Sequence, residues 1–126
     1  MVPLAVLIGA GLGGLARYAV GGWIHRFAGA GFPWGTLAVN VTGSLALGLL
    51  YVLLEGMAAP RAWRAFLGVG VLGGYTTFST FSYEAVRLLE DGQWARAGAY
   101  VLGSVVLSLA AAFFGFRIAA TILGRG

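Results

Sequence analysis

The residues best suited to bind a ligand lie inside long apolar stretches. They are an amide, Asn40, and two phenylalanines three residues apart, Phe78 and Phe81, within the hydroxyl-rich sequence GGYTTFSTFSYE at 73–84. Amide and hydroxyl protons and the positive edges of aromatic rings are weak donors, which together could replace part of the hydration shell of a small anion. They carry no fixed positive charge, so they would not hold the anion too tightly to release it. An isolated pair such as Phe78 and Phe81 would more often be ordinary packing aromatics, but together with the hydroxyls and the amide it could line a path for an anion.

Further polar residues recur at helical spacing. One set falls every four residues in the second apolar stretch and predicts a narrow stripe on one helix face: Thr36, Asn40, Ser44 and Gly48. Tyr100, Ser104 and Ser108 do the same in the last stretch. Single Ser and Thr residues in apolar helices usually bond to their own backbone or to a neighbouring helix. For Asn40, a role in packing and a role in a pathway are about equally well supported by the sequence.

The hydroxyl-rich segment also predicts an interruption of its helix. Gly73 and Gly74 weaken the helix, and Thr76 and Thr77 can form local hydrogen bonds instead. Irregular backbone at membrane depth is tolerated only where protein or a water-filled cavity surrounds it. Carbonyl groups freed by such a break can coordinate a cation.

The composition argues against an enzyme and against nucleic-acid binding. Hydrophobic residues make up 60% of the 126 residues and charged residues 10%, whereas soluble domains average about 25% charged residues. There is no cysteine, one histidine (His25) and only four acidic residues, which is a poor inventory for nucleophilic or acid–base catalysis. The eight basic residues are scattered singly instead of gathering on one face. We therefore expect a membrane protein.

Four apolar stretches have the length of membrane-spanning helices: 2–23, 34–54, 63–89 and 95–123. Each approaches or exceeds the roughly 20 residues needed to cross a bilayer. The tryptophans lie near their ends, as in an interfacial belt, and Pro33 and Pro60 stand just before the second and third stretches. The first stretch lacks a basic leader region, so we expect it to be retained. The sequence predicts an all-α membrane protein with one domain, residues 1–126, and four transmembrane helices, the third broken near the middle of the membrane.

One motif suggests a different fold. Gly9, Gly11 and Gly14 have the G-x-G-x-x-G spacing of a dinucleotide-binding turn. That motif requires an acidic residue about 20 positions later, but the first acidic residue is Glu55. We therefore favour helix packing, in which glycines such as Gly9 and Gly13 allow a close approach.

The arginines do not favour either orientation in the membrane. If the helices alternate in direction, one side receives Arg17, Arg26, Arg87 and Arg96, and the other receives Arg61, Arg64, Arg117 and Arg125. An equal division leaves the positive-inside rule without a preference. Either the sequence carries little topology information, or a partner sets the orientation, or the chain inserts both ways and pairs as an antiparallel homodimer.

Three segments together resemble the Fluc (CrcB) family of fluoride channels. They are residues 73–82 (GGYTTFSTFS), residues 35–44 (GTLAVNVTGS) and residues 13–18 (GGLARY). The chain length and the four-helix layout also agree, so the resemblance covers essentially the whole chain. Within the motif, Tyr75 occupies a position that we do not expect to be fixed.

The resemblance implies an antiparallel, dual-topology homodimer with two pores, which would export fluoride passively across the cytoplasmic membrane of a microbe and so relieve fluoride toxicity. Asn40, Phe78 and Phe81 would line the fluoride path, and a polar track would follow it: Tyr100, Ser104 and Ser108. The backbone carbonyls of Gly73 and Thr76 from both subunits would hold a structural sodium ion that is not transported. The partners implied are therefore fluoride, the lipid bilayer and a second copy of the chain.

Two charged residues near helix ends have ordinary structural explanations. We expect Arg17 to reach the lipid headgroups and Glu84 to pair with an arginine near a helix end.

Three other functions are alternatives to a fluoride channel. A small dual-topology multidrug or cation exporter of four helices would need a membrane carboxylate for proton exchange, and Glu84 is the only candidate. A purely structural protein would explain the glycines but not the joint placement of Asn40, Phe78 and Phe81 in apolar stretches, and a membrane enzyme lacks a convincing catalytic set.

Overall fold

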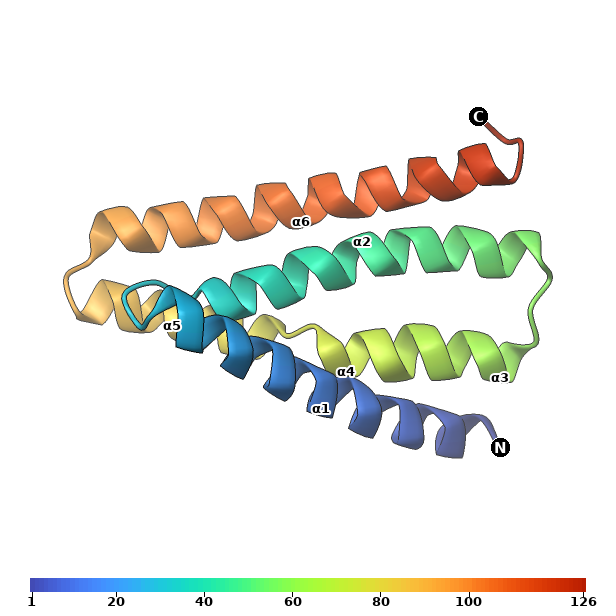
Figure 1. The fold of residues 1–126 in the computed structure, drawn as a ribbon, viewed down its shortest axis with the longest axis horizontal. Helices are drawn as coiled ribbons and strands as arrows, with labels where there is room; N and C mark the ends of the chain where they lie inside the picture. The colour runs from blue at the N-terminus through green and yellow to red at the C-terminus, as the bar shows by residue number, and fades with distance from the viewer.

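The computed structural model describes residues 1–126 and is helical throughout (Figure 1). Three helices are long: α1 (Val2–Ala28), α2 (Trp34–Gly56) and α6 (Trp94–Ile122). Four shorter helices lie between α2 and α6: α3 (Arg61–Arg64), the π-helix η1 (Ala65–Leu72), α4 (Gly73–Tyr75) and α5 (Phe78–Glu90). The prediction of an all-α protein is confirmed. The three long helices, α1, α2 and α6, are each long and apolar enough to cross a membrane.

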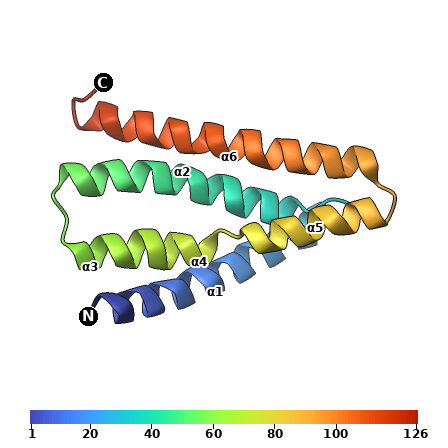
Figure 2. The same ribbon diagram turned by 180° about the vertical axis from the view of Figure 1, so that it is seen from behind.

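The first three short helices follow one another without a gap and form one rod. Figure 2 shows that this rod ends in an unwound stretch before α5 continues in a similar direction. Thr76 and Thr77, the residues of that stretch, have extended backbone angles. Gly73 and Gly74 remain helical, so the extended residues lie at the C-terminal end of the segment in which the sequence predicts an interruption.

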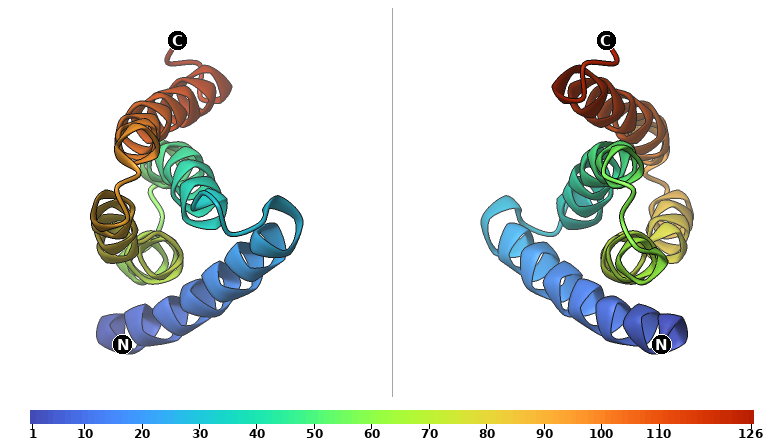
Figure 3. Two further views of the ribbon diagram at one scale, coloured as in Figure 1. Left: turned by 90° about the vertical axis from the view of Figure 1, so that its left-hand side faces the viewer. Right: turned by 90° about the vertical axis from the view of Figure 1, so that its right-hand side faces the viewer.

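Helix α2 occupies the middle of the structure. It contacts α6 on one side and the rod on the other, while α1 packs mainly against η1 and α4. The end-on views of Figure 3 show α1 inclined across the rod, on the side away from α6. Both termini lie at the same end of the long axis (Figure 1), as expected for a chain that traverses that axis four times.

Glycines allow the closest helix contacts. A Cβ atom on Gly9 would lie 2.5 Å from the Phe66 carbonyl oxygen, and one on Gly13 would overlap the carbonyl of Val71. A side chain at either position would therefore push α1 away from η1, which confirms the packing interpretation of this pair. Gly11, in contrast, has nothing within 4 Å of its Cβ position. The dinucleotide-binding interpretation is wrong, because the segment lies within α1 and follows no strand.

The first helix is longer than the sequence predicts. It continues past residue 23 to Ala28, through residues that we expected to form a connection. Nothing in the sequence IHRFA breaks a helix, so the helix continues until Gly29, which has a φ of 78° and donates its N–H to the His25 carbonyl. The π-helical turns of η1 are also not indicated by the sequence pattern.

Candidate functional site

The site centres on the extended pair Thr76–Thr77, where hydroxyl groups replace helical hydrogen bonds. The N–H and the Oγ1 hydroxyl of Thr76 both donate to the carbonyl oxygen of Leu72 at 3.0 Å. The Oγ1 of Thr77 accepts from the backbone N–H of Thr80 at 3.2 Å and so caps α5. The two threonines therefore form the local hydrogen bonds that the sequence predicts, and α5 can begin directly after the extended residues.

Asn40 of α2 holds this backbone from the side. Its Nδ2 donates to the Thr77 carbonyl at 2.9 Å, and its Oδ1 accepts from the Thr77 N–H at 2.7 Å. In an unbroken helix that N–H would bond to the carbonyl of Gly73, so the Asn40 amide replaces a helical hydrogen bond. An Asn amide has two N–H donors. One N–H of Asn40 is therefore left for another acceptor.

Five of the residues in the predicted fluoride path line one cavity of about 360 Å³, which we call the phenylalanine cavity: Asn40, Phe78, Phe81, Ser104 and Ser108. Thr76 and Thr77 also line it. Residues from α2, α5 and α6 thus meet beside the extended pair, although they are distant in the sequence. Tyr100 does not line the cavity but lies behind it, with its ring centroid 5.3 Å from that of Phe81.

The two phenylalanines have different surroundings. Their ring centroids are 5.5 Å apart, and the planes are inclined by 53°. Phe81 is only 8% exposed and belongs to a core cluster with Tyr100, Ala85 and Leu88. Phe78 is 78% exposed and projects from the surface of the single chain. Phe81 is therefore held in place within one chain, whereas the ring of Phe78 is not.

Ser104 is buried, and its Oγ has no hydrogen-bond partner in the protein. No other buried side-chain oxygen or nitrogen lacks one. Buried polar groups are normally paired, so the unpaired Ser104 hydroxyl has room for one more hydrogen-bond partner. The Ser104 hydroxyl is thus free to donate to an anion.

Glu84 joins three helices through hydroxyl groups. Its Oε1 accepts from Thr36 Oγ1 of α2 at 2.9 Å, and its Oε2 accepts from the Tyr100 hydroxyl of α6 at 2.8 Å. The expectation that Glu84 pairs with an arginine is wrong, since the only ion pair joins Arg87 and Asp91. The Tyr100 proton is directed at Glu84 and not toward the phenylalanine cavity. Thr36 precedes Asn40 by four residues, and Tyr100 precedes Ser104 by four. The two polar stripes in the sequence therefore included Thr36 and Tyr100, but their shared hydrogen bonds to Glu84 were not predicted.

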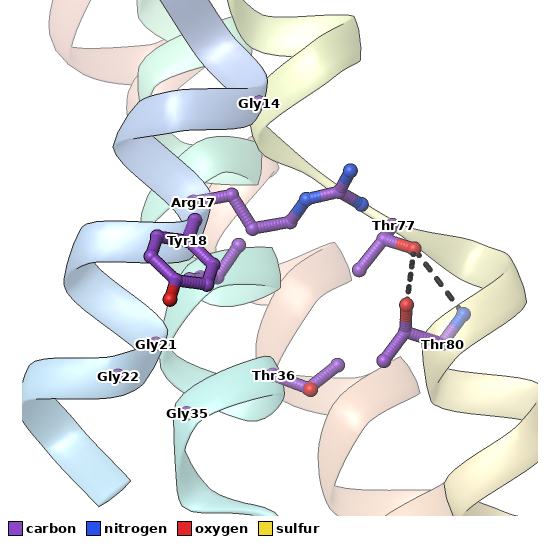
Figure 4. Close-up of a pocket in the computed structure, with 10 residues that line it drawn as sticks. Gly14, Arg17, Tyr18, Gly21, Gly22, Gly35, Thr36, Thr77 and Thr80 are labelled. Atoms are coloured by element: carbon purple, nitrogen blue, oxygen red, sulfur yellow. Dashed lines mark hydrogen bonds between the residues drawn. The ribbon is translucent and has the colours of Figure 1, made fainter.

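A second cavity, of about 450 Å³, is lined by the positively charged side chain of Arg17, and we call it the arginine cavity (Figure 4). Arg17, Thr36, Thr77 and Thr80 line it together with glycines of α1 and α2. Figure 4 shows the half-buried Arg17 side chain extending from α1 toward Thr77, and it forms no hydrogen bond or ion pair. This placement differs from the expected position at the headgroups. Thr77 lines both cavities, so the extended pair lies between them.

The long apolar helices and the polar cavities among them define a multi-pass membrane protein with a polar interior. Comparison with known sequences identifies the group to which it belongs. Residues 4–116 match the family described as CrcB-like protein, Camphor Resistance (CrcB), so the chain belongs to the CrcB family. This confirms the resemblance recognised from the three sequence segments.

Curated relatives are similar over nearly their whole length. A protein of Thermus thermophilus named "Fluoride-specific ion channel FluC" is 48% identical over 122 residues, covering 96% of this chain and 95% of the relative. A protein of the same name from Nitrobacter winogradskyi is 50% identical, covering 94% and 95% of the two chains. Another from Rhizobium meliloti is 51% identical, covering 90% and 93%.

Proposed function

We propose that this protein is a fluoride-selective channel that exports fluoride passively across the cytoplasmic membrane and so relieves fluoride toxicity. The observation that carries the proposal is the unpaired hydroxyl of Ser104, which lies in the same cavity wall as the Asn40 amide and the two phenylalanine rings. Every one of these groups offers a partial positive charge to an anion, and none is a fixed cation. The names of the relatives support fluoride as the ion.

The path uses the two cavities in sequence. The unpaired charge of Arg17 attracts the anion into the arginine cavity, where the hydroxyl of Thr80 replaces part of its water. The anion then passes the extended pair into the phenylalanine cavity. There, the free N–H of Asn40, the hydroxyls of Ser104 and Ser108 and the ring edges of Phe78 and Phe81 solvate it. Weak donors in series compensate for desolvation without trapping the ion.

Tyr100 supports the path from behind it. Because its proton is directed at Glu84, the phenol does not serve as the main donor to the anion. Its ring packs against Phe81 and orients that ring instead. The group Thr36–Glu84–Tyr100 also links α2, α5 and α6, and so holds the walls of both cavities together.

The channel is an antiparallel homodimer with two pores, in which each chain inserts in the opposite orientation to its partner. The exposed ring of Phe78 and the exposed hydroxyl residue Ser79 beside it support this arrangement. In a single chain the Ser79 hydroxyl would face lipid, which is unfavourable. A second copy covers Ser79 and completes the environment of Phe78. The equal division of arginines permits both orientations.

A structural sodium ion lies between the subunits and is not transported. The carbonyl oxygen of Thr76 accepts no hydrogen bond, and the carbonyl of Gly73 has lost its helical donor to Asn40. Such backbone oxygens are suitable ligands for a hard cation. The carbonyls of Gly73 and Thr76, together with the same two carbonyls of a second copy, would hold the ion without any carboxylate.

Fluoride efflux from sealed vesicles tests the function. Purified protein is reconstituted into liposomes loaded with potassium fluoride, and a fluoride electrode records efflux after a potassium ionophore is added. A channel releases fluoride without a proton gradient, whereas a multidrug exporter would instead move an organic cation in exchange for protons through Glu84. Proton-coupled organic cation transport without fluoride efflux would establish the exporter.

Ser104→Ala links the flux to the cavity. Loss of a hydrogen bond to a charged ion costs about 1.5–3 kcal/mol, so we expect flux to fall roughly tenfold or more. Thr121→Ala is the matched control, since it removes a hydroxyl that bonds to its own helix far from the cavity. Equal flux in the wild type and Ser104→Ala would remove this hydroxyl from the path.

A further inference from the structure

A pair of hydroxyl groups connects the end of α4 to α2, outside both cavities. The Tyr75 hydroxyl lies 3.0 Å from Thr42 Oγ1. Thr42 Oγ1 also lies 2.7 Å from the carbonyl oxygen of Ala38, which can only accept a hydrogen bond. A threonine hydroxyl has a single proton, and that of Thr42 is therefore directed at Ala38. It follows that Tyr75 is the donor and Thr42 Oγ1 the acceptor.

The backbone at the end of α4 is wedged between two glycines. A Cβ atom on Gly43 of α2 would overlap Thr76 Cγ2 and lie 3.0 Å from Tyr75 Cδ1. On the opposite side, a Cβ atom on Gly13 of α1 would lie 2.8 Å from the Tyr75 backbone nitrogen. These contacts set how closely the segment approaches its neighbours. They do not set how it rotates between them, because packing against glycine is not directional.

Helix α2 therefore holds the extended pair from both of its ends. Asn40 bonds to the backbone of Thr77, and Thr42 bonds to the side chain of Tyr75. Residues two positions apart on a helix are rotated by about 200°, so they point in nearly opposite directions. Thr76 lies between the two attachments, and its carbonyl oxygen accepts no hydrogen bond. The Asn40 amide limits rotation of this peptide group on one side, and the Tyr75 phenol limits it on the other.

We propose that Thr42 and Tyr75 are a positioning pair, whose hydrogen bond orients the Thr76 carbonyl and thereby sets the affinity of the cation site. The inference rests on the proposed function, which supplies the cation site, its sodium ion and the fluoride flux that reports on it. Neither residue lines the arginine cavity or the phenylalanine cavity, so neither contacts the anion on the proposed path. When the bond between Tyr75 and Thr42 is lost, the glycine contacts still keep the chain folded. The Thr76 carbonyl is then free to tilt away from the ion.

The test measures how fluoride efflux depends on sodium. Full-length wild type and variants are reconstituted with sodium replaced stepwise by a large organic cation on both sides of the vesicle. Tyr75→Phe removes the donor, and Thr42→Val removes the acceptor at nearly constant volume. Thr42→Ser keeps the hydroxyl. Tyr83→Phe is the matched control, because Tyr83 is exposed and its hydroxyl forms no hydrogen bond. Thermal unfolding in detergent at saturating sodium reports stability separately.

We expect Tyr75→Phe and Thr42→Val each to raise the sodium concentration for half-maximal flux by roughly threefold to tenfold, the effect of one hydrogen bond. Flux at saturating sodium should remain near that of the wild type. The double variant should shift no further than either single one, because both remove the same bond. Thr42→Ser and Tyr83→Phe should keep the wild-type midpoint.

The possible results separate this inference from the proposed function. An unchanged midpoint in Tyr75→Phe and Thr42→Val, even with reduced thermal stability, would show that the pair is only structural and would overturn the inference alone. Wild-type fluoride flux that is independent of sodium would overturn the inference and the cation site but would leave the channel. Absence of any fluoride flux in the wild type would overturn all three.

Discussion

Asn40 bonds to both backbone groups of Thr77, accepting from its N–H at 2.7 Å and donating to its carbonyl at 2.9 Å. The two residues are 37 positions apart, yet the side chain of one replaces the helical partner of the other. The same amide retains one N–H for the phenylalanine cavity. A single side chain thus stabilises the extended backbone and contributes to the proposed anion path, and these roles can be separated experimentally.

Asn40→Asp should lose nearly all fluoride flux. The substitution removes the donor to the Thr77 carbonyl, places a carboxylate in the path and repels the anion when ionised. Loss of the backbone bond should also lower the free energy of unfolding by about 1–3 kcal/mol. Efflux and thermal unfolding of the reconstituted and solubilised protein measure the two effects. Gln93→Glu is the control, because it makes the same chemical change at a residue that bonds to Arg96 outside the cavities. Wild-type flux in folded Asn40→Asp would contradict the path.

Phe81→Ile should reduce flux far more than it reduces stability. The side chain stays apolar, but the positive ring edge toward the anion is lost. Because Phe81 is buried against Tyr100, the smaller side chain should also cost about 1–3 kcal/mol of stability. Phe114→Ile on α6, which is exposed and far from either cavity, should leave the flux unchanged. A proportional loss of flux in both variants would point to general destabilisation.

Arg17→Gln should weaken the attraction of fluoride into the arginine cavity. We expect the fluoride concentration for half-maximal flux to rise, and the difference from the wild type to shrink at high ionic strength, where charges are screened over about 3 Å at 1 M salt. Arg26→Gln removes an exposed charge from the same helix and should have little effect. Flux measured across a series of salt concentrations checks the prediction. A difference that does not depend on salt would argue for a contact with the anion instead.

Orientation should respond to added arginines. A reporter after Gly126 should be accessible from both sides of the membrane in the wild type. Ala28→Arg with Ala30→Arg biases the connection between α1 and α2, and Glu55→Arg with Met57→Arg biases the opposite side. Each double variant should be inactive alone, because antiparallel pairs cannot form, and co-expression of the two should restore flux. Full activity of either double variant alone would exclude the antiparallel dimer.

Ala58→Gly should stabilise the protein without changing its flux. Ala58 has a φ of 50°, the only positive value at a residue other than glycine. The left-handed conformation costs an L-residue about 1–2 kcal/mol, and glycine largely escapes that cost. Ala59→Gly, at the next position, gains no such relief and should be neutral or destabilising. Thermal unfolding of the two variants distinguishes them, and a lower melting temperature for Ala58→Gly would contradict the prediction.

The sequence by itself determined the helical architecture and the residues of interest. Apolar stretches of membrane length can only form helices or barrels, because their backbone polar groups must be satisfied internally. Helical spacing in turn groups Asn40 with Thr36, and Ser104 with Tyr100, on shared faces. The segments at residues 73–82, 35–44 and 13–18 together were sufficient to recognise the family. These features are local, because each of them depends on the sequence of one continuous segment of the chain.

The tertiary structure decided which groups meet. Thr36 and Tyr100 converge on Glu84 from two helices, although an arginine partner was expected. Arg17 lies across a cavity toward Thr77 instead of reaching the headgroups (Figure 4). Gly9 and Gly13 pack closely, whereas a Cβ atom on Gly11 of the same helix would have nothing within 4 Å. Spacing places a side chain on a face of its own helix, but the crossing and rotation of neighbouring helices determine what that face meets, because ridges and grooves along the whole helix set both.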